Sequence, residues 1–409
     1  MKSWRIVALA LGVTAVLAAC GGDDEGSDGD GGDQGGGPAE QEPEEEEEPA
    51  ATPELVLSDS VTYAEPVTFE VENGTITSAD VVGEQGALEG TADGAGWTSE
   101  SPPLPGASYD VTVEATDADG GTHSLSGAFT VDEVPDGERL TLSVVRGGGD
   151  VVGVGTPIIV KFDQQVDERA AVEEAMNVAS DPQVNGAWFW VNSQEAHFRP
   201  EKYWPANSRI RVNLDLNGVQ AGPNLWGGRA YEYDIEVGDE RIARVDAAAK
   251  QFSLIHNGET VATWPTSLGA EDFETRNGIY VVQSKTDEYR MTSCNAGIAC
   301  DESDPEYYDV DTKFAVRLTN SGTFVHSAPW SEAAQGEENV SHGCLNLTEQ
   351  RAKTYFQQAR YGDVVEVVGS GRQPNDLVQR GDPGMVDWNR SWAEVLTLSA
   401  TGEFTTDQL

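Results

Sequence analysis

Basic residues, long apolar runs and helical periodicity are all scarce in this chain. Of its 409 residues, 25 are Lys or Arg and 71 are Asp or Glu, so the net charge is −46. This balance excludes nucleic acid and anionic lipid surfaces as main partners, because both repel a polyanion. The apolar run at residues 6–17 is too short for a permanent transmembrane helix. Helical periodicity does not appear until about residue 348.

The N-terminus has the features of a secretory signal. Lys2 and Arg5 precede the apolar run, and small residues close it. The residues LAAC, ending at Cys20, resemble a bacterial lipoprotein lipobox, in which the cysteine is lipidated and becomes the mature N-terminus. We therefore assign residues 1–20 to a signal peptide and lipidated Cys20, and expect an exported protein anchored by lipid to the outer face of the plasma membrane, facing the cell wall. An ordinary signal peptide cut near this position, with Cys20 incidental, is the alternative.

Residues 21–52 are rich in Gly and Asp and include an acidic run at 44–48. The segment has almost no apolar residues and no Lys or Arg, so it cannot form a core. Self-repulsion extends it, giving a reach of about 30 Å as a coil and about 100 Å when stretched. We interpret it as a disordered tether that lifts the folded part into the wall, which is compatible with a merely solubilising role.

About 355 residues follow the tether, too many for a single core. In residues 53–137, short runs alternate apolar and polar side chains, a glycine turn occupies 119–121, and Trp97 is a candidate core aromatic. These features predict an immunoglobulin-like β-sandwich. The alternating positions are Val67, Phe69 and Val71, then Tyr109, Val111, Val113 and Ala115.

Residues 138–238 predict a second immunoglobulin-like β-sandwich. Its alternating positions are Ile158, Val160 and Phe162; Trp188 and Trp190; and Ile210, Val212, Leu214 and Leu216. The sequence YWP at 203–205 suits either an aromatic sugar-binding shelf or core packing, and core packing is favoured.

Residues 239–370 predict a third domain, rich in strands but with one main helix. Strands are expected at 251–256, 261–267, 278–283, 314–319, 323–326 and 363–368. The helix should run from Thr348 to about Tyr361, because Ala352, Tyr355, Phe356 and Ala359 recur with helical spacing and Gly362 suits a C-terminal cap. Residues 371–409 form a mostly polar extension with Trp388 and Trp392 as packing anchors. The fold class is therefore mainly β.

A cysteine and two histidines cluster in the third domain. The segment SHGC ends at Cys344, and His326 with Ser327 lies within 18 positions, although the chain has only five histidines and four cysteines. Nucleophilic acyl transfer needs a thiolate, an imidazole to move the proton, and small residues that let backbone N–H groups approach an oxyanion. A free thiol has a pKa of about 8.5, and a nearby imidazolium is expected to lower it.

The two motifs resemble the signature of the L,D-transpeptidases, bacterial cell-wall enzymes. The matching segments are HSAPW at 326–330 and SHGCLN at 341–346, with support from PTSLG at 265–269, NGIY at 277–280 and GDVVEVV at 362–368. Two immunoglobulin-like domains before the catalytic domain are similar to the layout of the actinobacterial, mycobacterial-type members. The resemblance covers about residues 138–392.

The resemblance implies peptidoglycan stem peptides as partners and 3→3 cross-linking as the reaction. Cys344 would attack the bond between meso-diaminopimelate and D-alanine in a donor tetrapeptide, release D-alanine, and pass the thioester to the side-chain amine of an acceptor stem. The roles implied are His326 as base, oriented by Ser327; Gly343 and Cys344 as oxyanion donors; Tyr308, Ser321, Gly322 and Asn346 as substrate contacts; and Ser341 and His342 as supports. Acylation by carbapenems, a role in wall organisation and cell shape, and no metal or organic cofactor are also implied. We expect a monomer.

Cys294 and Cys300 depart from the family pattern. They lie where related enzymes carry a flap over the site, and a disulfide between them is the favoured interpretation in an oxidising exterior. This pairing leaves Cys344 free once Cys20 is lipidated.

Other interpretations of the cluster are weaker. A lone cysteine in a β domain is often only a small buried hydrophobe. A zinc site at His326, His342 and Cys344 lacks a convincing fourth ligand. Two alternative functions remain: an L,D-carboxypeptidase, in which water replaces the acceptor amine, and a non-catalytic wall-binding lipoprotein.

Overall fold

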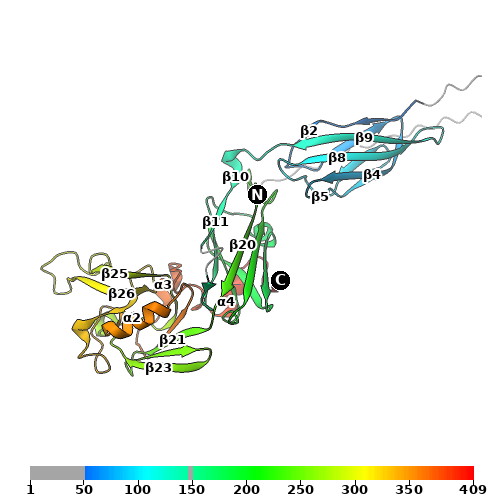
Figure 1. The fold of residues 1–409 in the computed structure, drawn as a ribbon. Helices are drawn as coiled ribbons and strands as arrows, with labels where there is room; N and C mark the ends of the chain where they lie inside the picture. Colours follow the sequence, from blue (N-terminus) through cyan, green and yellow to red (C-terminus); the bar gives the residue numbers. More distant parts are fainter. Residues whose placement is uncertain (1–50, 146–150) are drawn as a thin grey trace, which may run out of the picture. The chain divides into compact units, whose positions relative to one another are not determined.

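The computed structural model describes residues 51–145 and 151–409. The expected signal segment, the lipidation site Cys20 and nearly all of the tether lie outside these residues. Within the described ranges, no helix has the length and apolar character needed to cross a membrane. The fold is mainly β, as predicted, with two immunoglobulin-like sandwiches followed by a strand-rich third domain (Figure 1).

The first domain packs two sheets around an aromatic core. One sheet has the order β1 (Glu54–Val56), β3 (Thr68–Glu72), β7 (Gly96–Ser99), β6 (Gly90–Asp93); the other has β2 (Ser60–Val61), β9 (Thr122–Val131), β8 (Ser108–Thr116), β4 (Thr75–Gly83), β5 (Gly86–Ala87). Phe69 stacks on Trp97 with ring centroids 4.7 Å apart. Every apolar position predicted for these strands is buried, because alternation sends one face of each strand inward.

The second domain begins after a 3-10 turn, η1 (Asp136–Glu138), and is also a sandwich. A three-stranded sheet has the order β10 (Arg139–Leu140), β19 (Leu225–Gly227), β18 (Gln220–Gly222). A second sheet has the order β11 (Leu142–Val145), β13 (Ile158–Phe162), β16 (Glu195–Pro200), β15 (Asn185–Asn192), β30 (Phe404–Thr405). A third sheet has the order β12 (Val151–Val152), β20 (Ala230–Val237), β17 (Arg209–Asp215), β14 (Met176–Asp181), β31 (Asp407–Gln408). A short helix, α1 (Arg169–Glu174), precedes β14. Trp204 is 2% exposed and its indole N–H donates to the carbonyl of Thr156 at 2.8 Å, so the aromatic segment at 203–205 is core, as favoured.

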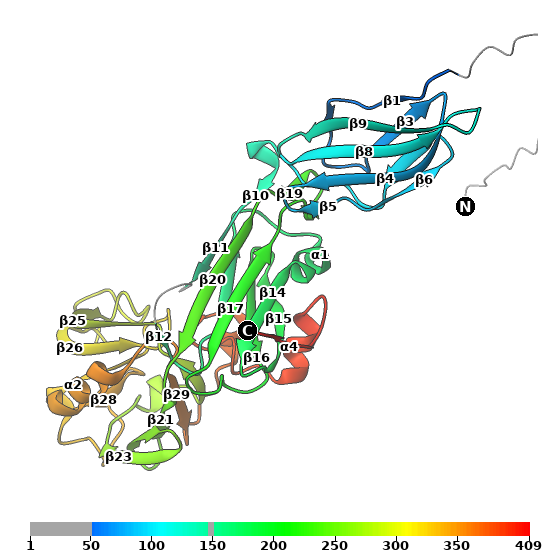
Figure 2. The ribbon, with the colours of Figure 1, turned by 45° about the vertical axis from the view of Figure 1, so that its right-hand side comes forward.

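The C-terminal extension returns to the second domain and completes its sheets. β30 pairs with β15, and β31 pairs with β14. In the sequence, α3 (Asn375–Gln379) and α4 (Trp392–Leu398) lie between the third domain and these two strands. Helix α4 packs on β15, as Figure 2 shows. Trp388 is a packing anchor, since its indole N–H donates to the carbonyl of Gly155 at 2.8 Å. The sequence pattern suggested the tryptophan anchors but not the two strands.

A buried ionic cluster also joins the extension to the second domain. His197 on β16 is fully buried, with Nδ1 2.7 Å from Asp387 and Nε2 2.9 Å from Glu195. Burial alone would lower the pKa of His197, but the two carboxylates outweigh burial and raise that pKa to about 9. The imidazole is therefore charged at neutral pH, between two carboxylates.

The third domain consists of two sheets and a helix. The first sheet has the order β23 (Glu259–Pro265), β22 (Gln251–His256), β21 (Arg241–Asp246), β29 (Val364–Val368), β24 (Gly278–Val281); the second has β25 (Ser284–Thr292), β26 (Asp309–Arg317), β27 (Phe324–Ser327), β28 (Leu345–Leu347). Two 3-10 turns, η2 (Glu271–Phe273) and η3 (Pro329–Ser331), lie in the connections. Side chains from both sheets and from α2 (Glu349–Gln358) share one apolar core.

Helix α2 is shorter than the sequence predicted. It begins after Thr348, whose hydroxyl accepts from the N–H of Arg351, and its C-terminal cap is Ala359. Gly362, at φ +86°, lies in the turn beyond the helix rather than at its cap. That turn contacts the second domain, where the N–H of Gly153 donates to the carbonyl of Tyr361 at 2.8 Å. Gly362 therefore allows the two backbones to approach each other closely.

The predicted disulfide between Cys294 and Cys300 is present in the loop that joins β25 to β26. We call residues 293–308 the flap. Ser293 ties the two ends of the flap together, because its N–H donates to the carbonyl of Tyr308 at 3.0 Å and its hydroxyl donates to Ala299 at 2.7 Å. The disulfide and these hydrogen bonds both restrict the flap.

Replacing His197 with Gln removes a charge whose stabilising effect depends on pH. Because the folded state raises the pKa of His197 from 6.5 to about 9, its stabilisation is complete below about pH 6.5 and is lost as the pH rises through 9. We expect the difference in free energy of unfolding between wild type and His197→Gln to shrink by on the order of 3 kcal/mol between pH 6 and 9.5. Urea unfolding followed by tryptophan fluorescence measures it, with His123→Gln in the first domain as control. An equal difference at both pH values would contradict the assignment.

Removing the disulfide should free the flap without unfolding the domain. For Cys294→Ala/Cys300→Ala, we expect faster amide hydrogen exchange across residues 293–308 and unchanged exchange in β21 and β29. The loss of the short covalent loop should cost roughly 2 kcal/mol of stability. Wild-type protein treated with a reductant should behave like the double variant. Unaltered exchange in the flap would mean that its hydrogen bonds alone hold it.

Candidate active site

Two parallel strands bring the predicted nucleophile and base together. β27 pairs with β28 so that Val325 faces Leu345 and His326 faces Asn346. Cys344 immediately precedes β28 and is therefore level with Phe324 at the start of β27, two residues before His326. His326 and Cys344 line one cavity of about 300 Å³, which also contacts Tyr308 and Trp330. His326 and Cys344 thus share one site, as the sequence predicted for a base and a nucleophile.

The hydrogen bonds of His326 fix which ring nitrogen carries the proton. Nδ1 lies 2.8 Å from the carbonyl oxygen of Ser327 and 3.0 Å from Oγ1 of Thr312. Thr312 gives its own hydroxyl proton to the same carbonyl, at 2.5 Å. Both neighbours of Nδ1 can then only accept, so Nδ1 is the protonated nitrogen and Nε2 keeps its lone pair. Ser327 thus contacts the imidazole through its backbone carbonyl.

Thr312 is a site residue that the sequence did not reveal. It is 4% exposed and lies on β26, next to β27 in the sheet. A threonine in a β-strand carries no signal of its own, because threonine is common in strands. Only the pairing of β26 with β27 identifies it.

Asn346 lies beside the imidazole in the wall of the cavity. It is 2% exposed, and its amide donates to the hydroxyl of Ser331 at 3.1 Å. The polar amide of Asn346 favours the imidazolium and so partly offsets the lowering of the pKa of His326 by burial. Its amide side chain is thus held within the protein on the imidazole side of the cavity.

Burial leaves both reacting groups neutral. It raises the pKa of the Cys344 thiol to about 11, against smaller lowering effects from the Phe324 backbone and Arg317. Burial also lowers the pKa of His326 to about 4, although Ser327 and Asn346 oppose this. The sequence led us to expect a thiol with its pKa lowered by an imidazolium; the structure gives a thiol and a neutral imidazole, because desolvation disfavours both charged forms.

The thiol is directed at a backbone carbonyl in this structure. Sγ of Cys344 donates to the carbonyl of Gly322 at 3.6 Å. Gly322, at φ +102°, is held in a turn by the residues around it. The N–H of Ser321 donates to Asp382 at 3.3 Å, and the hydroxyl of Ser321 pairs with Thr319 at 3.0 Å. Gly322 therefore lines the site, while the side chain of Ser321 bonds within its own turn.

The backbone around Cys344 has an unusual conformation. Gly343 has φ +116°, which side-chain-bearing residues rarely adopt. Its N–H donates to the hydroxyl of Ser341 at 3.1 Å, and that hydroxyl donates to the carbonyl of Cys344 at 2.7 Å. The N–H of Cys344 makes no hydrogen bond to any residue that the structure describes. Of the two predicted oxyanion donors, the N–H of Cys344 is free and that of Gly343 is engaged.

The flap reaches the site through Tyr308 and Glu306. The ring of Tyr308 lies 4.9 Å from that of His342, which also packs at 4.6 Å on Phe273. Nε2 of His342 lies 2.8 Å from a carboxylate oxygen of Glu306. His342 thus packs against the flap and pairs with it, while His326 has the contacts suited to a base. The acidic flap residue Glu306 was not singled out from the sequence.

Tyr308 and Cys344 line two cavities in common. The second cavity, of about 100 Å³, is lined by Tyr308, Arg317, Gly322 and Cys344, among others. Burial, and to a smaller extent the proximity of Cys344, raises the pKa of Tyr308 to about 12, so its hydroxyl keeps its proton. Cys344 therefore borders both cavities. Among the described residues, no cluster of His, Cys, Asp and Glu suits a metal ion.

Comparisons with known proteins agree with this geometry. Residues 58–220 match the family described as bacterial Ig domain, and residues 240–367 match the L,D-transpeptidase catalytic domain. L,D-transpeptidase 2 of Mycobacterium tuberculosis is 34% identical over 341 residues, covering 81% of this chain and 80% of that protein. L,D-transpeptidase 1 of the same species is 38% identical over 227 residues, covering 56% and 84%.

A crystal structure of Mycobacterium tuberculosis L,D-transpeptidase 1 is 32% identical, covers 57% of this chain and 100% of that chain, and gives a TM-score of 0.45. The family assignment does not depend on this structural match. It follows from the catalytic-domain match and from the 34% identity maintained over most of both chains. The chain belongs to the L,D-transpeptidase family.

Proposed function

We propose that this protein forms 3→3 cross-links in peptidoglycan through a thioester on Cys344. The observation that carries the proposal is the fixed tautomer of His326 in a cavity that it shares with Cys344. With Nδ1 protonated, Nε2 is able to accept the thiol proton. Membership of the family supports the choice of stem peptides as substrate.

The first half-reaction releases D-alanine. As Sγ attacks the carbonyl carbon of meso-diaminopimelate, Nε2 of His326 takes the thiol proton and the carbonyl oxygen becomes an oxyanion. When the oxyanion collapses, the C–N bond breaks, His326 gives its proton to the leaving amine, and a thioester remains on Cys344. In the second half-reaction, the side-chain amine of an acceptor stem attacks the thioester, His326 takes a proton from it, and the thiol is restored.

The neutral resting state determines how the first step begins. Because the pKa of Cys344 is about 11 and that of His326 about 4, an ion pair is scarce before substrate binds. We infer that proton transfer accompanies sulfur attack instead of preceding it. Asn346 and the carbonyl of Ser327 favour the imidazolium as it forms, since both raise the pKa of His326.

The free N–H of Cys344 is the first oxyanion donor in this proposal. The N–H of Gly343 joins it when Ser341 turns its hydroxyl away, which costs two neutral hydrogen bonds, about 2 kcal/mol in total. An oxyanion donor is worth roughly 3–4 kcal/mol in the transition state, so the exchange is favourable. The two cavities flanking Tyr308 give donor and acceptor stems separate approaches to the sulfur.

The location and assembly of the protein are also proposals. We infer a monomer held by lipid at Cys20 on the outer face of the plasma membrane, with the acidic segment 21–52 spanning toward the wall. The lipobox-like residues before Cys20 and the composition of the segment support this arrangement.

The reaction is tested by incubating the purified protein with a disaccharide-tetrapeptide and analysing the products by mass spectrometry. We expect cross-linked dimers together with free D-alanine, and no products from Cys344→Ala. A carbapenem should add its mass to wild type and not to that variant. Free D-alanine without dimers would indicate a carboxypeptidase, and no turnover with no carbapenem adduct would indicate a non-catalytic wall-binding protein. Dimers from Cys344→Ala would overturn the mechanism.

Thr312→Val tests whether Thr312 positions the base. Valine keeps the shape but loses the oxygen that accepts from Nδ1, so we expect kcat to fall about tenfold with little change in KM. The acid limb of the wild-type pH–rate profile should lie near pH 4, because burial lowers the pKa of His326, and it should move in the variant.

The matched control is Thr354→Val, which changes a hydroxyl on the surface of α2 that bonds only to the carbonyl of Gln350. An unchanged kcat and pH profile in Thr312→Val would show that Ser327 alone orients the ring.

A further inference from the structure

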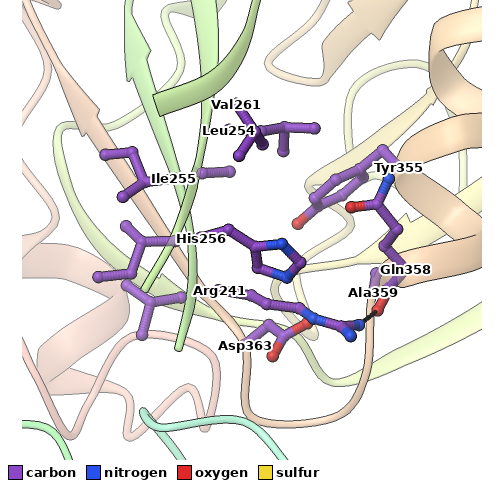
Figure 3. Close-up of a pocket in the computed structure, with 12 residues that line it drawn as sticks. Arg241, Leu254, Ile255, His256, Val261, Tyr355, Gln358, Ala359 and Asp363 are labelled. Atoms are coloured by element: carbon purple, nitrogen blue, oxygen red, sulfur yellow. Dashed lines mark hydrogen bonds between the residues drawn. The ribbon is translucent and has the colours of Figure 1, made fainter. Parts of the chain in front are cut away.

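A third cavity in the catalytic domain lies between β21, β22 and α2, and Figure 3 shows its lining. It shares no residue with the two cavities that meet at Cys344. Its volume of about 20 Å³ is enough for one small occupant. The proposed transfer reaction makes no use of it.

Four enclosed polar atoms border this cavity without a hydrogen-bond partner among the described residues. They are Oη of Tyr355, Oδ1 of Asp363, Nε2 of His256 and Nε of Arg241. Tyr355 is 5% exposed and Asp363 is 3% exposed. Figure 3 shows the phenol oxygen of Tyr355, the ring of His256 and the side chain of Arg241 converging from three different elements. Buried polar groups are nearly always paired, so four around one small space indicate a site for a ligand.

The charges around the cavity are mostly positive. Arg241 reaches across it and donates to the carbonyl of Gln358. Lys285 donates to the carbonyls of Phe356 and Ala359 at 2.9 and 2.7 Å, at the end of α2. Asp363 is the carboxylate in the lining. Its Oδ2 accepts from the N–H of Arg360 at 2.9 Å, which leaves Oδ1 facing the cavity.

Three of the four unpartnered atoms call for an acceptor, and the carboxyl of Asp363 joins them only when it is protonated. Nε of Arg241 is only a donor, and the hydroxyl of Tyr355 and the imidazole of His256 are both able to donate. A buried guanidinium nitrogen without an acceptor is costly, and a negative charge compensates it better than a neutral molecule does. Leu254, Ile255 and Val261 form the apolar part of the wall and limit the size of the occupant.

We propose that this cavity binds one small monovalent anion, of halide or formate size, through Arg241, Tyr355 and His256. A halide and a small carboxylate share the required chemistry, which is a single negative charge that accepts several hydrogen bonds. The bound anion connects β21, β22 and α2, the helix that follows β28 directly.

Asp363 makes binding depend on pH. Burial raises the pKa of Asp363 to about 7, so its carboxyl is largely neutral below that pH and repels an anion above it. The groups that face it from neighbouring elements are Arg241 on β21, His256 on β22, Lys285 on β25, Tyr355 on α2 and Arg360 in the turn after α2. The anion should therefore bind more tightly at pH 6 than at pH 8.5.

The test uses bromide and formate with the purified protein. Crystals soaked in bromide, with diffraction measured above the bromine absorption edge, should show an anomalous peak between Arg241 and Tyr355. In solution, sodium bromide and sodium formate should each raise Tm relative to sodium gluconate, whose anion is too large, at the same ionic strength. The rise should be larger at pH 6 than at pH 8.5. A response to only one of the two anions identifies which class the site takes.

Two variants separate this site from general salt effects. Tyr355→Phe removes one donor and should abolish the extra rise in Tm, whereas Tyr233→Phe on β20 should keep it. If Tyr355→Phe fails to fold, His256→Gln replaces it. No anomalous peak together with equal Tm in bromide, formate and gluconate would mean that the cavity holds water only, and would overturn the proposal. Because no readout uses catalysis, the outcome is independent of the proposed transfer reaction.

Discussion

The parallel pairing of β27 with β28 is the constraint on which the active site depends. It sets Val325 against Leu345, and this register places Cys344, just before β28, two positions along the sheet from His326 on β27. A shift of one residue would turn His326 to the opposite face of the sheet and away from the cavity. The register is held by burial, since Val325, Leu345 and Leu347 are all fully enclosed in the core that the two sheets share with α2. The chemistry therefore depends on apolar packing that includes no reacting group.

The same burial sets the electrostatics of the site. An exposed thiol and imidazole would keep nearly ordinary pKa values, and the imidazole would be partly charged at neutral pH. Here burial raises the pKa of the Cys344 thiol and lowers the pKa of the His326 imidazole, so both groups stay uncharged. The protein compensates with neutral dipoles, namely the carbonyl of Ser327, the hydroxyl of Thr312 and the amide of Asn346. These dipoles cost little while the imidazole is neutral and favour the cation once it forms. The arrangement suits a reaction in which charge exists only transiently.

Much of the fold and part of the site could be predicted from the sequence. Alternating runs such as Ile210 to Leu216 predicted strands, because a half-buried strand has only one way to present its apolar side chains. The clustering of the histidine and cysteine motifs predicted a shared site, and the expected oxidising exterior predicted the disulfide between Cys294 and Cys300. In contrast, Thr312 and Glu306 were missed. Each acts through a neighbour brought close only by sheet pairing or by a loop, and neither has a distinctive local pattern. The ionisation states were also missed, because desolvation depends on how deeply each group lies and not on its sequence neighbours.

The two short C-terminal strands have a consequence for biosynthesis. β30 and β31 form from residues 404–408, yet they provide edge strands to two sheets of the second domain, whose other strands end at residue 237. During translation, the second domain has every strand except these until residues 404–408 emerge. The catalytic domain is thus encoded between the parts of a sandwich that closes last. A chain cut short before residue 404 therefore keeps two open sheet edges in the second domain, where other strands are able to add.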